Sequence, residues 1–260
     1  MYGTIDALLD RMRADLDVMR RDGDARRFFH GTYLRTTEAV AAEIERGGFA
    51  DGDWLRRWDL AFAGFYLNAL DADRAGEGVP GPWRVAFAAA RDRPDLPPLR
   101  HVLFGINAHI NYDLPQALLA VISPADFDNP ELSRGRAEDH RRLDAVLAGR
   151  VAAEDDELDA VSKVTLLDRL LRPANRAASR RFLAESREKV WHNAQVLDRA
   201  RRAGPDRYAA VLAALERLSE ARLADLTAPG PVLLKLARRG FGVLLPADPG
   251  RTTGREDAAG

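Results

Sequence analysis

Hydrophobic residues recur along most of the chain at intervals of three and four, the spacing of a helix that is buried on one side. The first such segment, residues 4–20, has an apolar stripe made of Ile5, Leu8, Leu9, Met12, Leu16 and Met19. The same spacing predicts further helices over 24–46, 53–72, 83–92, 98–122, 131–149, 157–171, 174–203 and 205–226. This pattern is typical of an all-α protein.

Glycine and proline separate the helical segments. Gly47 and Gly48 follow the second segment, where a helix C-cap is expected, and Asp51 or Asp53 is placed to cap the third. Residues 73–82 are rich in both residue types and predict a loop. These breaks are short, so they connect packed helices rather than separate domains.

The C-terminal part of the chain looks different. Residues 240–246 form the only stretch with strand character, and a single strand has no partner. Residues 246–260 lack apolar anchors and are expected to be disordered. We therefore expect one all-α domain, a bundle of about eight helices over 1–245, followed by a disordered tail.

Composition narrows the class of protein. The 39 basic and 40 acidic residues give a net charge of −1, so no overall field favours nucleic acid or an anionic membrane. The absence of cysteine removes disulfides, thiolate metal ligands and cysteine nucleophiles. The acidic, amphipathic N-terminus is not typical of a signal peptide, and no apolar run is long enough for a transmembrane helix. We expect a cytoplasmic protein without membrane insertion and without nucleic acid as a partner.

The predicted helix over 98–122 carries an unusual set of polar residues. Asn107, His109, Asn111 and Asp113 stand among aliphatic and aromatic residues. Residues four apart lie on the same face, so His109 pairs with Asp113 and Asn107 with Asn111. A buried carboxylate is costly unless it is paired, hydrogen-bonded or bound to a metal. The sequence therefore predicts a site in this helix.

Two further residues of the same helix bear on this site. Gly105 lies on the stripe of His109 and Asp113 and would let a ligand or another backbone approach closely. Pro115 has no backbone N–H, so the carbonyl of Asn111 loses its helical partner and a kink is expected there.

Three other helices offer partners for His109 and Asp113. His30 stands on a largely apolar helix with Tyr33 on the same side, and Asp59 lies beside Trp58. The candidate ligands of a divalent metal (Zn, Fe, Mn or Mg) are His109, Asp113, His30, Asp59 and His192. The candidate catalytic residues are His109, Asp113, Asn107, Asn111 and Tyr33.

The same residues also fit a structural network. In that interpretation Asp113 fixes the tautomer of His109 and the asparagines satisfy exposed backbone groups. Asp59 would be a salt-bridge partner of an arginine such as Arg56. His192, which follows a tryptophan, would lie at the surface. The sequence leaves both interpretations open.

The motif Asn107-Ala108-His109-Ile110-Asn111-x-Asp113-Leu114 resembles an uncharacterised bacterial family, common in actinobacteria, that is known only as a domain of unknown function. The earlier stretch HGTYLRTTEAV, residues 30–40, shares this resemblance, which covers much of residues 25–200. It implies a helical domain and brings no established activity.

A second similarity is to zinc-dependent phospholipase C and S1-type nucleases, all-helical families that bind metals through H-x-x-x-D pairs. It would imply metal ligands at His109 and Asp113, and also at His140 and Asp144. This chain has only five histidines and lacks the N-terminal tryptophan ligand of those families. Charged residues surround His140 and Asp144, so we expect that pair to face solvent.

A third pattern is Asp155-Asp156-x-x-Asp159, which resembles the magnesium-binding motif of class I terpene synthases. These acids open a predicted helix, where the helix dipole favours them without any metal. The second metal motif of that family has no full match in this chain, so helix capping is the preferred interpretation.

Three functions follow from these patterns. The first is a metal-dependent hydrolase or oxidase, in which metal-bound water attacks a small, partly apolar substrate. The second is a metal-free enzyme, such as a cyclase of secondary metabolism, with His109 as a general base held by Asp113. The third is a noncatalytic helical module that binds a ligand or another protein. The oligomeric state stays open.

Overall fold

A computed structural model describes residues 3–132, 134–136, 138–139, 142–143, 188–229, 240 and 242–247. Its helices are α1 (Ile5–Arg21), α2 (Arg27–Glu45), α3 (Gly52–Ala75), α4 (Gly81–Asp92), α5 (Pro98–Ala108), the π-turn η1 (His109–Asp113), α6 (Leu114–Val121), α7 (Pro124–Asp128) and α10 (Pro205–Thr227). Residues 188–203 are also helical. The all-α prediction is confirmed, and the described residues contain no strand.

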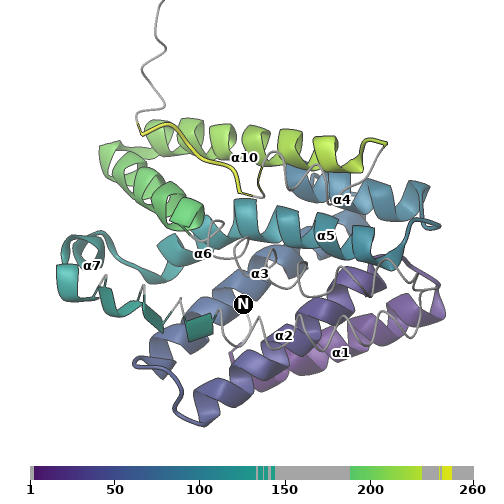
Figure 1. The fold of residues 1–260 in the computed structure, drawn as a ribbon, viewed down its shortest axis with the longest axis horizontal. Coiled ribbons are helices and arrows are strands. Elements are labelled where there is room, and N and C mark those ends of the chain that lie inside the picture. The colour runs from purple at the N-terminus through teal and green to yellow at the C-terminus, as the bar shows by residue number, and fades with distance from the viewer. Residues whose placement is uncertain are drawn as a thin grey trace, which may run out of the picture.

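The helices surround one continuous central helix. α1 and α2 lie side by side at one edge, α10 packs on α4 at the opposite edge, and α5, η1 and α6 cross between them (Figure 1). α5 contacts α2, α4 and α10, while α6 packs on α3. The central helix is therefore enclosed on several sides, which places its side chains in the core.

Helices begin at a polar cap and stop at a glycine where the sequence predicted these signals. The Asp51 side chain accepts a hydrogen bond from the backbone N–H of Trp54 at 2.9 Å, so Asp51 is the N-cap of α3. Gly47 follows α2 with a φ of +73°, a left-handed conformation that favours glycine. The loop after α3 is shorter than predicted, because α3 continues to Ala75 before Gly76.

The central helix contains a π-turn that the sequence pattern did not predict. The backbone N–H of Leu114 donates to the carbonyl of His109, five residues back instead of four. Pro115 follows at once and has no N–H to donate, so the regular hydrogen-bond ladder cannot continue through this turn. The Gln116 side chain donates to the Tyr112 carbonyl at 2.8 Å. The expected distortion at Pro115 thus takes the form of a π-turn.

The strand candidate over 240–246 was wrong for its described residues. Residues 242–246, which we name the C-terminal strap, run without regular secondary structure and are held by side chains. The Asn193 amide donates to the Val243 carbonyl at 3.0 Å and accepts from the Leu245 N–H at 2.8 Å. One asparagine thus replaces the backbone partner that a strand would need.

One further difference concerns residues 123–130. A short helix, α7, forms where a loop was expected, because the Ser123 hydroxyl caps it by accepting from the Asp126 N–H. The segment 157–171, the pair His140 and Asp144, the acidic motif over 155–159 and the tail beyond 247 lie outside the described residues.

Gly105 brings two helices into direct contact. A Cβ atom at this position of α5 would lie 2.2 Å from the Phe29 ring of α2. That ring also packs against Tyr33, Tyr66 and Trp83, so it has little room to move. The expected close approach at Gly105 is present, and the group that approaches is an aromatic side chain.

Replacing Gly105 with alanine should therefore destabilise the protein. We expect Gly105→Ala to lower the free energy of unfolding by about 1–3 kcal/mol, since overpacking outweighs the better helix propensity of alanine. Gly64→Ala is the matched control, because a Cβ at that position of α3 meets nothing within 4 Å. Urea denaturation should show Gly64→Ala unchanged or more stable, and equal effects of the two variants would contradict the packing argument.

The strap should come loose when Asn193 loses its amide. Asn193→Ala leaves the Val243 carbonyl and the Leu245 N–H without partners, which should cost about 2–4 kcal/mol of stability. Hydrogen exchange at the Leu245 amide should become at least about tenfold faster. Asn68→Ala, an exposed asparagine of α3, serves as the control. Unchanged exchange at Leu245 in Asn193→Ala would show that other contacts hold the strap.

Candidate functional site

His109 and Asp113 meet inside the protein as the sequence predicted. Both are buried, and His109 Nδ1 lies 2.8 Å from Asp113 Oδ2. The π-turn contains both residues, so its geometry sets how the imidazole and the carboxyl group face each other. π-turns within α-helices occur frequently at functional sites. The central pair of the predicted site is thus in place.

Trp83 completes this arrangement from a neighbouring helix. Its indole Nε1–H donates to Asp113 Oδ2 at 2.8 Å, so two nitrogens approach the same carboxyl oxygen. When Asp113 is ionised, His109 must carry its proton on Nδ1 to donate, and Nε2 then presents a lone pair. Among the described residues Nε2 has no hydrogen-bond partner. A buried, oriented and unpartnered imidazole nitrogen is the main chemical feature of the site.

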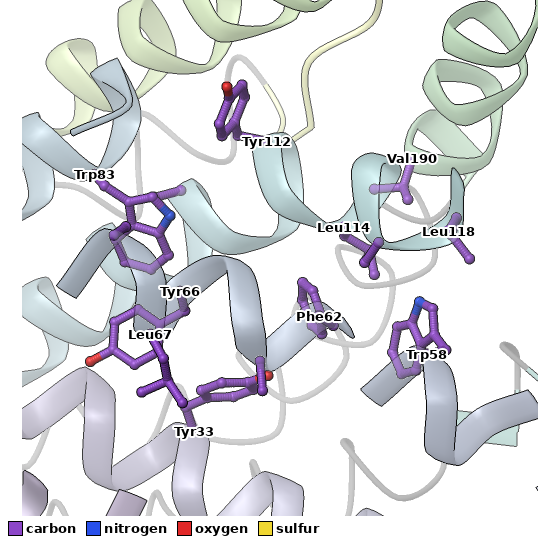
Figure 2. Packing of buried hydrophobic residues seen from close by; sticks show 14 of the residues in the cluster. Tyr33, Trp58, Phe62, Tyr66, Leu67, Trp83, Tyr112, Leu114, Leu118 and Val190 are labelled. Carbon is purple, nitrogen blue, oxygen red and sulfur yellow. The ribbon is translucent and has the colours of Figure 1, made fainter. Parts of the chain in front are cut away.

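Aromatic rings surround the His109 imidazole. Phe62 of α3 stacks on it almost in parallel, with ring centroids 3.6 Å apart, and Tyr33 of α2 meets it edge-on at 4.6 Å. The other rings within about 6 Å belong to Phe29, Tyr66 and Trp83. Figure 2 shows Tyr33, Phe62, Tyr66 and Trp83 in this part of the core. We name these five rings the aromatic cage.

Burial in the aromatic cage favours the uncharged forms of His109 and Asp113. Burial lowers the pKa of His109 well below its usual value, so the imidazole stays neutral. Burial also raises the pKa of Asp113 well above its usual value, opposed by the hydrogen bond from Trp83. Burial thus favours the neutral form of both groups, and the position of the proton between them decides whether His109 Nε2 is an acceptor or a donor.

Two further polar groups lie in the same part of the core. Burial raises the pKa of Tyr33 well above its usual value, and the charges of Asp59 and Asp113 raise it further. Asp59 is buried as well, which raises its pKa to about 7. The Tyr33 hydroxyl and Asp59 Oδ2 have no hydrogen-bond partner within the described parts of the chain. The two tyrosine hydroxyls point in opposite directions, Tyr33 away from Tyr66 (Figure 2).

The structure does not support His30 as a metal ligand. His30 Nε2 lies 2.8 Å from the Met12 carbonyl, and Nδ1 lies 2.8 Å from the Tyr66 hydroxyl. The carbonyl must accept from Nε2–H, so Nδ1 accepts from the hydroxyl and no ring nitrogen remains for a metal. His30 is a core histidine that joins α1, α2 and α3, and it fixes the hydroxyl of one cage residue.

Asn111 and His192 bind backbone groups instead of a substrate or a metal, and for Asn111 this is the role that the structural-network interpretation predicted. Asn111 Oδ1 accepts from the Val243 N–H at 3.2 Å, and His192 Nε2 lies 3.0 Å from the Leu245 carbonyl. Both side chains hold the C-terminal strap, so neither is positioned on the His109 imidazole. Asn107 is fully buried on α5.

The five predicted metal ligands therefore do not converge. His30 and His192 bond elsewhere, and the described residues contain no group of three or more histidines and carboxylates that could hold a metal. His109, Asp113 and Asp59 are the members of the predicted set that remain in the aromatic core.

A small cavity lies beside the aromatic cage. It has a volume of about 20 Å³, and its lining includes Phe29, Tyr66, Trp83, Arg26 and His101. This volume holds a single water molecule. We name it the inner cavity; entry of a larger molecule would require the surrounding helices to move.

Sequence reasoning missed Trp83. A buried indole requires an acceptor for its N–H, and Asp113 requires donors, so the two needs are complementary. The chain has four tryptophans, however, and no spacing rule links residue 83 to residue 113. Phe29 was likewise not predicted as part of the site, although its ring lies on Gly105 and belongs to the cage.

A family of unknown function, DUF5995, matches residues 5–229. The chain belongs to this family. The expected membership of an uncharacterised family is thus confirmed, and the DUF5995 match extends beyond residues 25–200 at both ends. No curated protein and no solved structure matches the chain. Within the described residues, none of the helices of this DUF5995 protein has the length and apolar character needed to cross a membrane.

Stability should depend on pH through Asp59. Its pKa is raised in the folded state to about 7, so the folded protein holds this proton between about pH 4 and pH 7 while the unfolded chain releases it. Stability is greatest below that range and falls as the pH rises through it, by roughly 4 kcal/mol for this group.

Asp59→Asn should remove this dependence. The variant should be more stable than the wild type above pH 7 by a few kcal/mol, and closer to it at pH 5, as measured by urea denaturation at both values. Asp53→Asn is the control, since this carboxyl is exposed on the same helix. If Asp59→Asn keeps the wild-type difference between the two pH values, burial is not what governs this carboxyl group.

Proposed function

We propose that this protein is a metal-free acid–base enzyme in which His109 Nε2 exchanges a proton with a small, partly apolar substrate. The supporting observation is the unpartnered Nε2 of an imidazole whose other nitrogen is held by Asp113. Buried polar atoms in native proteins are normally satisfied, so one that is left without a partner requires an explanation. A proton acceptor waiting for its substrate is such an explanation.

Asp113 acts through His109 and positions it. As a carboxylate, Asp113 holds the Nδ1–H tautomer and stabilises the positive charge that His109 gains when Nε2 takes a proton. Trp83 keeps the carboxyl group in place by donating to the same oxygen. Because burial raises the pKa of Asp113, general-base activity should increase as the pH rises through that raised pKa.

The surroundings indicate the class of substrate. Five aromatic rings face the imidazole, so the part of the substrate that reacts would be flanked by apolar surface. Among the described residues, the Tyr33 hydroxyl and Asp59 Oδ2 also lack hydrogen-bond partners, and Asp59 with a pKa of about 7 is suited to donate or accept a proton near neutral pH. A small aromatic or alicyclic molecule with one carbonyl or hydroxyl group fits these features.

A noncatalytic role is the alternative, and the size of the inner cavity favours it. A volume of about 20 Å³ admits water but no substrate, so catalysis requires the helices around the cage to separate. In the alternative, His109, Asp113 and Trp83 form a closed polar network that stabilises the core. The two functions differ in whether His109 ever meets a ligand.

NMR titration with a library of small ketones, esters and phenols distinguishes the catalytic from the noncatalytic role of His109. We expect some members to shift the His109 ring resonances and to be converted by the protein. His109→Gln should reduce that conversion by at least about 100-fold, the usual contribution of a general base. Conversion by the wild type should rise with pH, following the raised pKa of Asp113.

Two controls keep the result interpretable. Thermal unfolding of His109→Gln shows whether the variant is folded, and Asn68→Ala reports the effect of an exposed substitution. If no library member shifts the His109 resonances, or if folded His109→Gln converts the same compounds at the wild-type rate, the pair is structural.

A further inference from the structure

A second, larger cavity lies at the surface and is lined by arginines. It has a volume of about 550 Å³ and lies between the end of α3, the loop over 76–79 and α4. Arg26, Arg74, Arg84 and Arg91 line it, together with Asp73 and Glu77. Within this lining, four arginines stand beside two carboxylates. Its volume is within the usual range of small-molecule sites, roughly 300–1,000 Å³.

Carboxylates hold these arginines in place. Asp73 binds two of them, Arg26 Nη1 at 2.6 Å and Arg91 Nη1 at 2.7 Å. From outside the lining, Asp15 binds Arg74 Nη1 at 2.7 Å. In the same way Asp24 holds Arg26 and Glu220 holds Arg84. The guanidinium groups are therefore ordered before any ligand arrives, which lowers the entropy cost of binding.

The arginines still have donors to offer. Arg74 and Arg91 bond through Nη1 alone, and Arg84 through Nη2 alone, among the described residues. A guanidinium has five N–H donors in a planar fork that matches the oxygens of a phosphate. The side chains of Arg84 and Arg91 are 61% and 50% exposed, so their remaining donors are accessible.

We propose that this cleft binds the phosphate group of a small phosphorylated molecule. A phosphate monoester has three oxygens that can accept hydrogen bonds from several guanidinium groups at once, through the donors that the carboxylates leave unused. The site is separate from the proposed general base, although Arg26 also lines the inner cavity.

Phenyl phosphate is a suitable probe, followed by NMR at the backbone amides of Gly76 and Gly78 in the loop of the cleft. We expect saturable shifts at these amides and weaker binding of benzoate, which has a single charge. Arg84→Gln/Arg91→Gln should raise the Kd for phenyl phosphate at least about tenfold. Arg56→Gln is the matched control, because Arg56 is also exposed and pairs with a carboxylate, but lies at the start of α3.

Further variants separate this proposal from the proposed function. Arg84→Gln alone changes a single exposed side chain, so we expect this variant to fold even if the double variant does not. It should raise the Kd for phenyl phosphate about threefold. His109→Gln should bind phenyl phosphate as the wild type does. Absence of saturable shifts, equal weakening by Arg56→Gln, or tighter binding of benzoate would each overturn the phosphate site.

Discussion

The Asp113 carboxyl group lies among aromatic rings, where a carboxylate is tolerated only if donors surround it or a proton neutralises it. The Trp83 indole and the His109 imidazole both reach the same oxygen. Two elements, α4 and the π-turn, are thereby tied to one atom. The chemistry of His109 follows from this arrangement, because the proton on Asp113 decides which imidazole nitrogen carries hydrogen.

The π-turn links this interior pair to the C-terminal part of the chain. Its extra residue allows the chain to pass Pro115 without breaking, and it contains both the pair and Asn111. Asn111 in turn binds the strap, which Asn193 and His192 hold from a later helix. The buried pair and the strap are therefore both attached to residues of this one turn.

The periodic pattern was sufficient to predict the helices and the all-α class, because apolar stripes, the Asp51 cap and Gly47 are local signals. It was also sufficient for the pair, since a spacing of four brings His109 and Asp113 together on any helix. The π-turn could not be derived, because Pro115 predicts a distortion but not its form. Trp83, and the asparagines that bind the strap, depend on contacts between residues far apart in sequence. His30 was misjudged for the same reason, because its carbonyl and hydroxyl partners lie on other helices.

The decisive measurement for the His109–Asp113 pair is which ring nitrogen of His109 carries hydrogen. In protein labelled with ¹⁵N-histidine, long-range ¹H–¹⁵N correlation distinguishes a protonated ring nitrogen from one with a lone pair. At a pH above the raised pKa of Asp113, we expect hydrogen on Nδ1 and a lone pair on Nε2, with a change of tautomer as the pH falls. Hydrogen on Nε2 at every pH at which the protein is folded would contradict this expectation.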